Sequence, residues 1–153
     1  MIVVSDTSAI TALPGIGRIG LLHELFSRVL IPPAVERELL AFHDSLPSFV
    51  RVEPLLDQAT LLRLQPLLDE GEAEAIALAK MQQPDWLLMD EARGRAIAER
   101  EGLRVIGLAG SLVIAKRQGF VKSVTELLDA LERESGFYLS KRIRAEVLKS
   151  AGE

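Results

Sequence analysis

In the stretch IVVSDTS at residues 2–8, a short β-branched run is followed by an aspartate, Asp6. A run of this length, bounded by turn-forming residues, is typical of a buried strand. Three other runs share this character, and a weaker fifth candidate covers residues 49–52. The four clear strand predictions are residues 2–4, 29–31, 86–89 and 103–106.

Helical patterns lie between the predicted strands. Proline at Pro33 favours a helix start, because its missing N–H is not needed in the first turn. Asp69, with Glu72 three residues later, resembles a capping box. The predicted helices cover residues 33–42, residues 69–82, a segment from Ser123 onward, and a basic segment at about 140–150.

This alternation of strands and helices predicts one α/β domain. Right-handed crossovers between successive strands give a mostly parallel sheet of about five strands, covered by helices on both faces. In such sheets the functional crevice lies beyond the carboxyl ends of the strands. Residues that directly follow a strand are therefore the first candidates for a functional site.

Length and composition narrow the class of protein. The chain has 153 residues, 48% of them hydrophobic, and no cysteine, which excludes disulfides and thiolate chemistry. No apolar run is long enough for a membrane span, and residues 1–8 lack the basic region of a signal peptide. We therefore expect a cytoplasmic protein. Its net charge of -4 counts against a passive nucleic-acid binder.

Two aspartates follow predicted strands directly. Asp6 comes after residues 2–4, and Asp90 comes after residues 86–89. If both strands are parallel, the two carboxylates project at the same edge of the sheet. The alternative for each is a helix N-cap, a position that aspartate favours.

Two glutamates fall within apolar helical stripes. Glu38 lies in the stripe of the helix that begins at Pro33, and Glu74 lies in that of the next long helix. A glutamate in such a place is costly unless it is paired or binds a ligand. The alternative is a salt bridge to an arginine such as Arg37 or Arg95.

Together these four carboxylates predict a metal site. At about 5 Å apart, two carboxylates repel by roughly 3 kcal/mol at an effective dielectric of 20, so four together are poorly explained by stability. Oxygen-only ligands suit Mg²⁺ or Mn²⁺. Such a site can activate water for in-line attack on a phosphodiester, leaving a 3′-hydroxyl and a 5′-phosphate.

The same motifs resemble those of PIN-domain proteins, including the VapC-type toxins. The strand followed by Asp6-Thr7-Ser8 is similar to the start of that family, and so is the run from Ile31 to Leu39. Residues 71–79 resemble its Ala-rich middle motif, and residues 87–91 resemble its strand ending in aspartate. The resemblance covers residues 1 to about 120.

This resemblance implies a three-layer α/β/α PIN-like domain across residues 1–153, which cleaves single-stranded RNA with Mg²⁺ or Mn²⁺. It also implies a toxin with an antitoxin partner, and small domains of this kind commonly form homodimers. The expected residues are Asp6, Glu38, Glu74 and Asp90 for catalysis, with Asp6, Glu74 and Asp90 holding metal, Ser8 and Glu91 supporting them, and Lys116 and Arg117 contacting RNA.

Two other functions stay open. Leu88 and Ala92 stand where many family members have polar residues, which favours a catalytically degenerate interaction module as the alternative. A phosphoryl-transfer domain with Asp6 as nucleophile is the third hypothesis. It lacks a second acid beside Asp6 and a lysine on the late strand.

Overall fold

The computed structural model describes all 153 residues and contains one five-stranded parallel sheet, in the order β3-β2-β1-β4-β5. All five predicted strands are confirmed, including the weak candidate at residues 49–52. The strands are β1 (Ile2–Ser5), β2 (Arg28–Ile31), β3 (Val50–Val52), β4 (Trp86–Leu88) and β5 (Val105–Ile106).

Nine α-helices connect and cover these strands. The helix predicted to reach Phe42 ends at Leu40, and the side chain of Phe42 is exposed. A 3₁₀ turn covers Leu13–Ile16. The helices are α1 (Thr7–Ala12), α2 (Gly20–Leu25), α3 (Pro33–Leu40), α4 (Gln58–Leu64), α5 (Glu70–Gln82), α6 (Ala92–Arg100), α7 (Leu108–Arg117), α8 (Val124–Ser135) and α9 (Lys141–Ser150).

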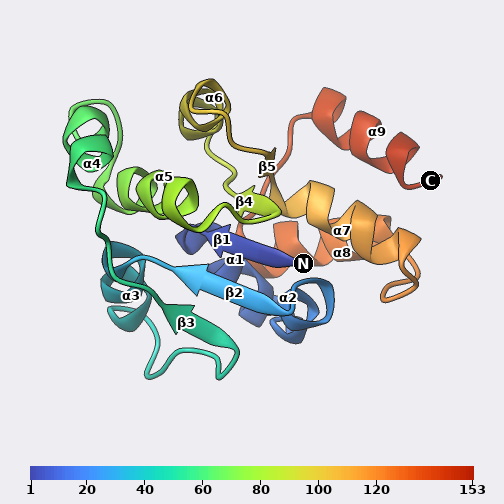
Figure 1. The fold of residues 1–153 in the computed structure, drawn as a ribbon. Coiled ribbons are helices and arrows are strands. Elements are labelled where there is room, and N and C mark those ends of the chain that lie inside the picture. Colours follow the sequence, from blue (N-terminus) through green and yellow to red (C-terminus); the bar gives the residue numbers. More distant parts are fainter.

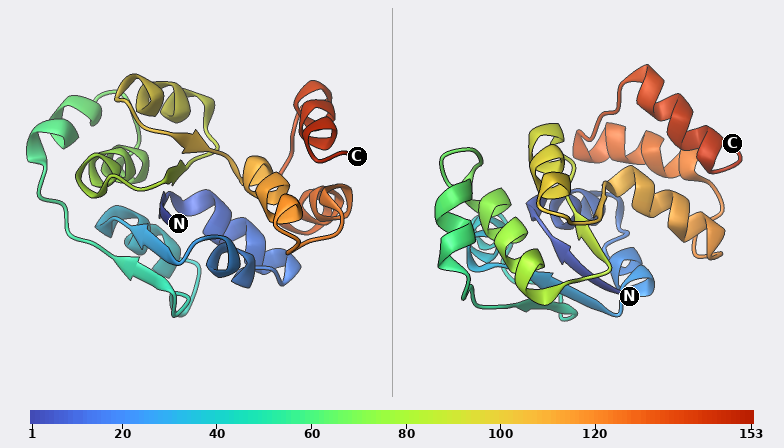
Figure 2. Two further views of the ribbon diagram at one scale, coloured as in Figure 1. Left: turned by 45° about the vertical axis from the view of Figure 1, so that its right-hand side comes forward. Right: turned by 45° about the horizontal axis from the view of Figure 1, so that its top comes forward.

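Successive strand residues point into two separate cores, as the twofold side-chain period of a strand requires. Val3 packs with residues of α1, α2, α3, α7 and α8 on one face. Val4 packs with residues of α4, α5 and α6 on the other face. The molecule is therefore a three-layer α/β/α structure, and Figures 1 and 2 show the sheet between its two helical layers.

β1 lies at the centre of the sheet, and later strands are added first on one side of it and then on the other. From β1 the chain adds β2 and β3 on one side, and it then returns to add β4 and β5 on the other. The carboxyl ends of β1 and β4 are joined by the Asp6 N–H, which donates to the Leu88 carbonyl at 3.1 Å. This edge is the expected place for a site in an open α/β sheet.

Helix α9 packs on the outside of α7, and Figure 1 shows it on the opposite side of the molecule from α4. The carboxylate of Glu153 fixes the C-terminal end of α9, because it accepts hydrogen bonds from the N–H of Val124 at 2.7 Å and from Lys116 Nζ at 2.8 Å. These bonds hold the pKa of Glu153 well below its usual range. No helix combines the length and the apolar character that crossing a bilayer requires.

Candidate metal-dependent active site

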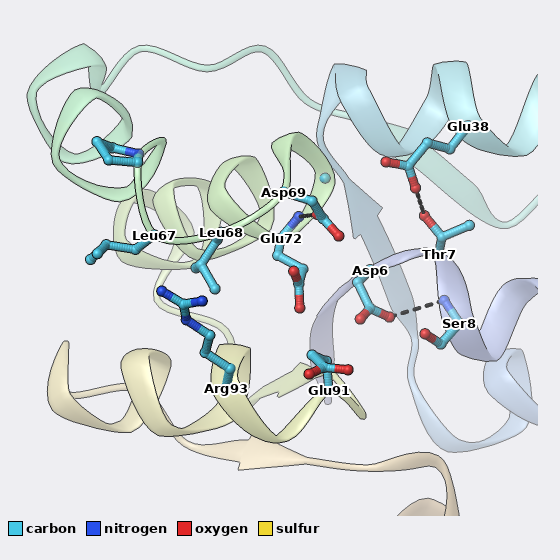
Figure 3. Close-up of a pocket in the computed structure, with 12 residues that line it drawn as sticks. Asp6, Thr7, Ser8, Glu38, Leu67, Leu68, Asp69, Glu72, Glu91 and Arg93 are labelled. Atoms are coloured by element: carbon cyan, nitrogen blue, oxygen red, sulfur yellow. Dashed lines mark hydrogen bonds between the residues drawn. The ribbon is translucent and has the colours of Figure 1, made fainter. Parts of the chain in front are cut away.

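A cavity of about 560 Å³ opens at the carboxyl edge of the sheet. Five of its lining residues are acidic, and they come from four separate segments of the chain. Figure 3 shows the side chains of Asp6, Glu72 and Glu91 projecting into the same space. The acidic lining residues are Asp6, Glu38, Asp69, Glu72 and Glu91.

Asp6 is buried at the inner end of this cavity, with 5% of its surface exposed. It is the N-cap of α1, and its Oδ1 accepts from the Ser8 N–H at 3.1 Å. Burial and then the negative charge of Asp90 raise the pKa of Asp6 to about 8. Asp6 therefore both caps α1 and lies near another carboxylate, so the N-cap alternative and the predicted acidic cluster do not exclude each other.

Asp90 lies beside Asp6 and is half-buried. Its Oδ1 accepts from the Leu108 N–H at 3.0 Å, which caps the start of α7. Its Oδ2 is buried and has no hydrogen-bond partner. Burial raises the pKa of Asp90, although the bond from Leu108 and the charge of Arg95 act in the opposite direction.

Glu72 enters the cavity, although the sequence pattern explained it as a cap. Asp69 caps α5 alone, since its Oδ1 accepts from the Glu72 N–H at 2.8 Å. The Glu72 side chain instead points into the cavity, where its Oε2 is buried without a partner. Burial, followed by the neighbouring Asp69, raises the pKa of Glu72 to about 7.

Glu38 lines the cavity from α3 and is exposed rather than part of the core. Its carboxylate accepts a hydrogen bond from the Thr7 hydroxyl, which ties α3 to the start of α1. It forms no ion pair, so the salt-bridge alternative does not apply to this residue. Its side chain lies at the opposite end of the cavity from Arg93 (Figure 3).

Glu74 is buried, as its place in the apolar stripe of α5 indicates, but it does not line the cavity. Its Oε1 accepts from the Ala34 N–H at 3.0 Å, and its Oε2 lies 3.8 Å from Arg37. The N-cap position of α3 is Pro32, which has no side-chain acceptor. Glu74 therefore caps α3 from a neighbouring helix. Burial raises the pKa of Glu74, and the nearby Arg37, whose closer partner is Glu70, offsets this only in part.

Three glycines each leave space for one carboxylate of the site. A Cβ on Gly71 would lie 2.7 Å from Glu38 Oε1, and one on Gly94 would lie 2.8 Å from Glu72 Oε2. A Cβ on Gly107 would lie 2.8 Å from Asp90 Oδ1. At Gly94 and Gly107 the nearest atoms are Met89 Sδ at 2.7 Å and Arg95 Nη1 at 2.6 Å, so a side chain there would displace these groups as well as a carboxylate.

The other predicted residues divide between the cavity and the far side of the molecule. Ser8 and Glu91 line the cavity, and Ser8 supports Asp6 through its backbone N–H. Lys116 and Arg117 lie on α7 outside the cavity lining, where they bond to Glu153 and to the Ser150 carbonyl. Contact between these two residues and RNA stays a prediction.

The donor set of the cavity fits a hard divalent cation. All of its charged acceptors are carboxylates, which suit Mg²⁺ or Mn²⁺. No three of them are already arranged as a metal-binding group. Asp90 does not itself line the cavity, but it lies beside Asp6, which does. The fit rests on Asp90 Oδ2 and Glu72 Oε2, because a buried carboxylate oxygen without a donor is costly unless a cation or water meets it.

Comparison with known proteins agrees with this architecture. A family model described as a PIN domain matches residues 2–153, nearly the whole chain. No curated relative matches the chain. The chain belongs to the PIN-domain family, whose members are generally nucleases that bind nucleic acid and typically use divalent metals.

Proposed function

We propose that this protein is a metal-dependent endoribonuclease that cleaves single-stranded RNA. One observation carries the proposal. Two buried carboxylate oxygens, Asp90 Oδ2 and Glu72 Oε2, have no hydrogen-bond partner, and both groups lie near the buried carboxyl of Asp6. Such an arrangement destabilises the fold on its own and is relieved by a divalent cation.

In this proposal Asp6, Glu72 and Asp90 hold the metal, with Glu72 in the place that the sequence pattern assigned to Glu74. When bound, the metal activates water and offsets the charge that builds on a phosphodiester oxygen. Glu38 is exposed to the cavity and held by Thr7. We assign Glu38 the role of orienting the attacking water and accepting its proton.

The position of Asp6 within the cavity supports a single-stranded substrate. The buried position of Asp6 requires a phosphodiester that enters the cavity, which a flexible single strand does more readily than a stacked duplex. The choice of RNA rests on the resemblance to VapC-type toxins.

The proposal extends to the cellular setting. On the resemblance to VapC-type toxins, we place it as the toxin of a toxin–antitoxin pair with a protein antitoxin. The proposed location is the cytoplasm. A homodimer, which presents two such cavities, is the proposed assembly.

The decisive experiment compares the wild-type protein with Asp6→Asn on a labelled single-stranded RNA. Asparagine keeps the acceptor for the Ser8 N–H, so the variant retains its cap. We expect cleavage by the wild type with Mg²⁺ or Mn²⁺, products with a 5′-phosphate, and no cleavage by Asp6→Asn or with EDTA. Equal activity in both proteins would overturn the proposal, and a folded but inert wild type would favour an interaction module.

A further inference from the structure

The cavity has a second end whose chemistry differs from that of the acidic cluster. Here the lining consists of three apolar residues of the segment between α4 and α5, together with one arginine of α6. Figure 3 shows Arg93 beside Leu67 and Leu68, away from Glu38 and Thr7. The residues of this end are Pro66, Leu67, Leu68 and Arg93.

Arg93 is the only cation in the lining of the cavity. It makes no ion pair, even though five carboxylates line the same cavity. Arg37, which reaches the same region from α3, is by contrast paired with Glu70. The Arg93 guanidinium therefore has all its donors available for an anion from outside the protein.

An anionic substrate needs such a group, because the rest of the cavity repels it. A phosphodiester that approaches this acidic lining meets an unfavourable field, even though the raised pKa values of Asp6 and Glu72 reduce its negative charge in the absence of metal. A guanidinium binds phosphate oxygens in a bidentate manner, which fixes the orientation of the strand as well as its charge.

The apolar residues at this end of the cavity are exposed to solvent, and no contact within the protein accounts for this exposure. Leu67 has 43% of its surface exposed, and Leu68 is half-buried. An apolar surface beside a cation matches a nucleotide, whose base has an apolar face and whose phosphate is charged. The two features lie within one cavity, so a single ligand can contact both.

We propose that Arg93, Leu67 and Leu68 form a nucleotide subsite that binds the residue next to the cleaved phosphodiester. Arg93 binds its phosphate, and the two leucines contact its base or ribose. This inference rests on the proposed function, because it names how the same cavity holds its RNA substrate.

The test measures binding of a fluorescein-labelled single-stranded RNA by anisotropy, across a series of salt concentrations. The Asp6→Asn variant serves as the parent protein, so that no cleavage occurs. We expect Arg93→Ala to weaken binding and to reduce the salt slope by about 0.7, which corresponds to one phosphate contact on a single strand. Arg100→Ala is the matched control, because Arg100 is also exposed and unpaired at the other end of α6.

A second pair of variants tests the apolar wall. We expect Leu67→Ala to weaken binding severalfold with an unchanged salt slope, because it removes contact area and no charge. Leu62→Ala is its control, since Leu62 is 66% exposed on α4 and does not line the cavity. A loss with Leu67→Ala alone supports the subsite.

The outcomes separate this inference from the nuclease function. Equal effects of Arg93→Ala and Arg100→Ala, or no effect of either, overturn the subsite. If the wild type still cleaves RNA in that case, the nuclease function stands. If the wild type cleaves no RNA but the Arg93 and Leu67 variants alone lose binding, the subsite stands and catalysis fails.

Discussion

Gly71 of α5 lies directly against the carboxylate of Glu38 on α3, and a Cβ at Gly71 would come within 2.7 Å of Glu38 Oε1. No atom other than those of the Glu38 carboxyl group stands so near to this position. The glycine therefore leaves room for the carboxylate of Glu38.

Replacement of Gly71 by alanine is expected to separate stability from activity. Alanine is favoured over glycine in a helix by up to about 1 kcal/mol, and the exposed Glu38 side chain can rotate away. We expect an unchanged or higher melting temperature and cleavage reduced by about tenfold or more. Gly20→Ala on α2 is the control, because a Cβ there meets nothing within 4 Å; a matching loss of activity in both variants would contradict the assignment.

The two nearby glutamates of α5 should respond in opposite ways. Glu72→Ala removes a buried, unpartnered carboxylate oxygen, so we expect retained or increased stability and strongly reduced cleavage. Glu74→Ala leaves the Ala34 N–H without its acceptor, which costs about 1–3 kcal/mol, while folded molecules still cleave. Chemical denaturation and initial cleavage rates measure the two effects. The reverse pattern would return the catalytic assignment to Glu74.

Stability without metal should fall as the pH rises. Burial raises the pKa of Asp6 from 3.8 to about 8, so the folded protein keeps a proton that the unfolded chain has lost. Each increase in pH across this window therefore lowers the free energy of unfolding. Thermal unfolding in EDTA should show a smaller decline for Asp6→Asn. Glu101, whose pKa is lowered from 4.5 to about 2, affects the curve only at acidic pH.

Divalent metal should stabilise the protein through the same carboxylates. At one hundred times its Kd, a ligand of the folded state adds about 2.7 kcal/mol. We expect Mn²⁺ to raise the melting temperature of the wild type and to have much less effect on Asp90→Asn, which keeps an acceptor for Leu108. Asp44→Asn, which removes an exposed carboxylate outside the cavity, should respond like the wild type. No shift in the wild type would contradict a metal site.

The end of α9 should depend on one side chain. Glu153 accepts hydrogen bonds from Val124, Thr125 and Lys116. We expect Glu153→Ala to lower the melting temperature and to speed hydrogen exchange at the amides of residues 124–126, with cleavage unchanged. Glu146→Ala on the same helix forms no such bonds and serves as the control. Protection unchanged in Glu153→Ala would show that other contacts hold α9.

The sequence predicts the sheet and the two strand-end aspartates well, because both follow from local patterns. A buried strand is a short apolar run, and the residue after it lies at the carboxyl edge of the sheet. Asp6 and Asp90 lie where this argument places them. Short helices such as α1 and α2 were not predicted, since segments of six residues form helices only through tertiary packing.

Hydrophobic periodicity could not show which of Glu72 and Glu74 lines the cavity. Residues from Ala73 to Ala79 are all buried, so α5 has apolar neighbours on nearly every side and no single stripe. Two positions apart on a helix correspond to about 200°, which sends the two side chains in nearly opposite directions. Glu74 is buried as expected, but against α3. That Asp69 caps α5 without the side chain of Glu72 is seen only in the structure.

The order of strands also determines when this site can exist during synthesis. Asp6, Glu38 and Glu72 leave the ribosome before β4, yet β4 must pair with β1 before Asp90 stands beside Asp6. A domain generally folds as a unit during synthesis. A partly made chain therefore carries most of its acidic residues without a complete site, and the proposed cleavage of RNA requires a finished sheet.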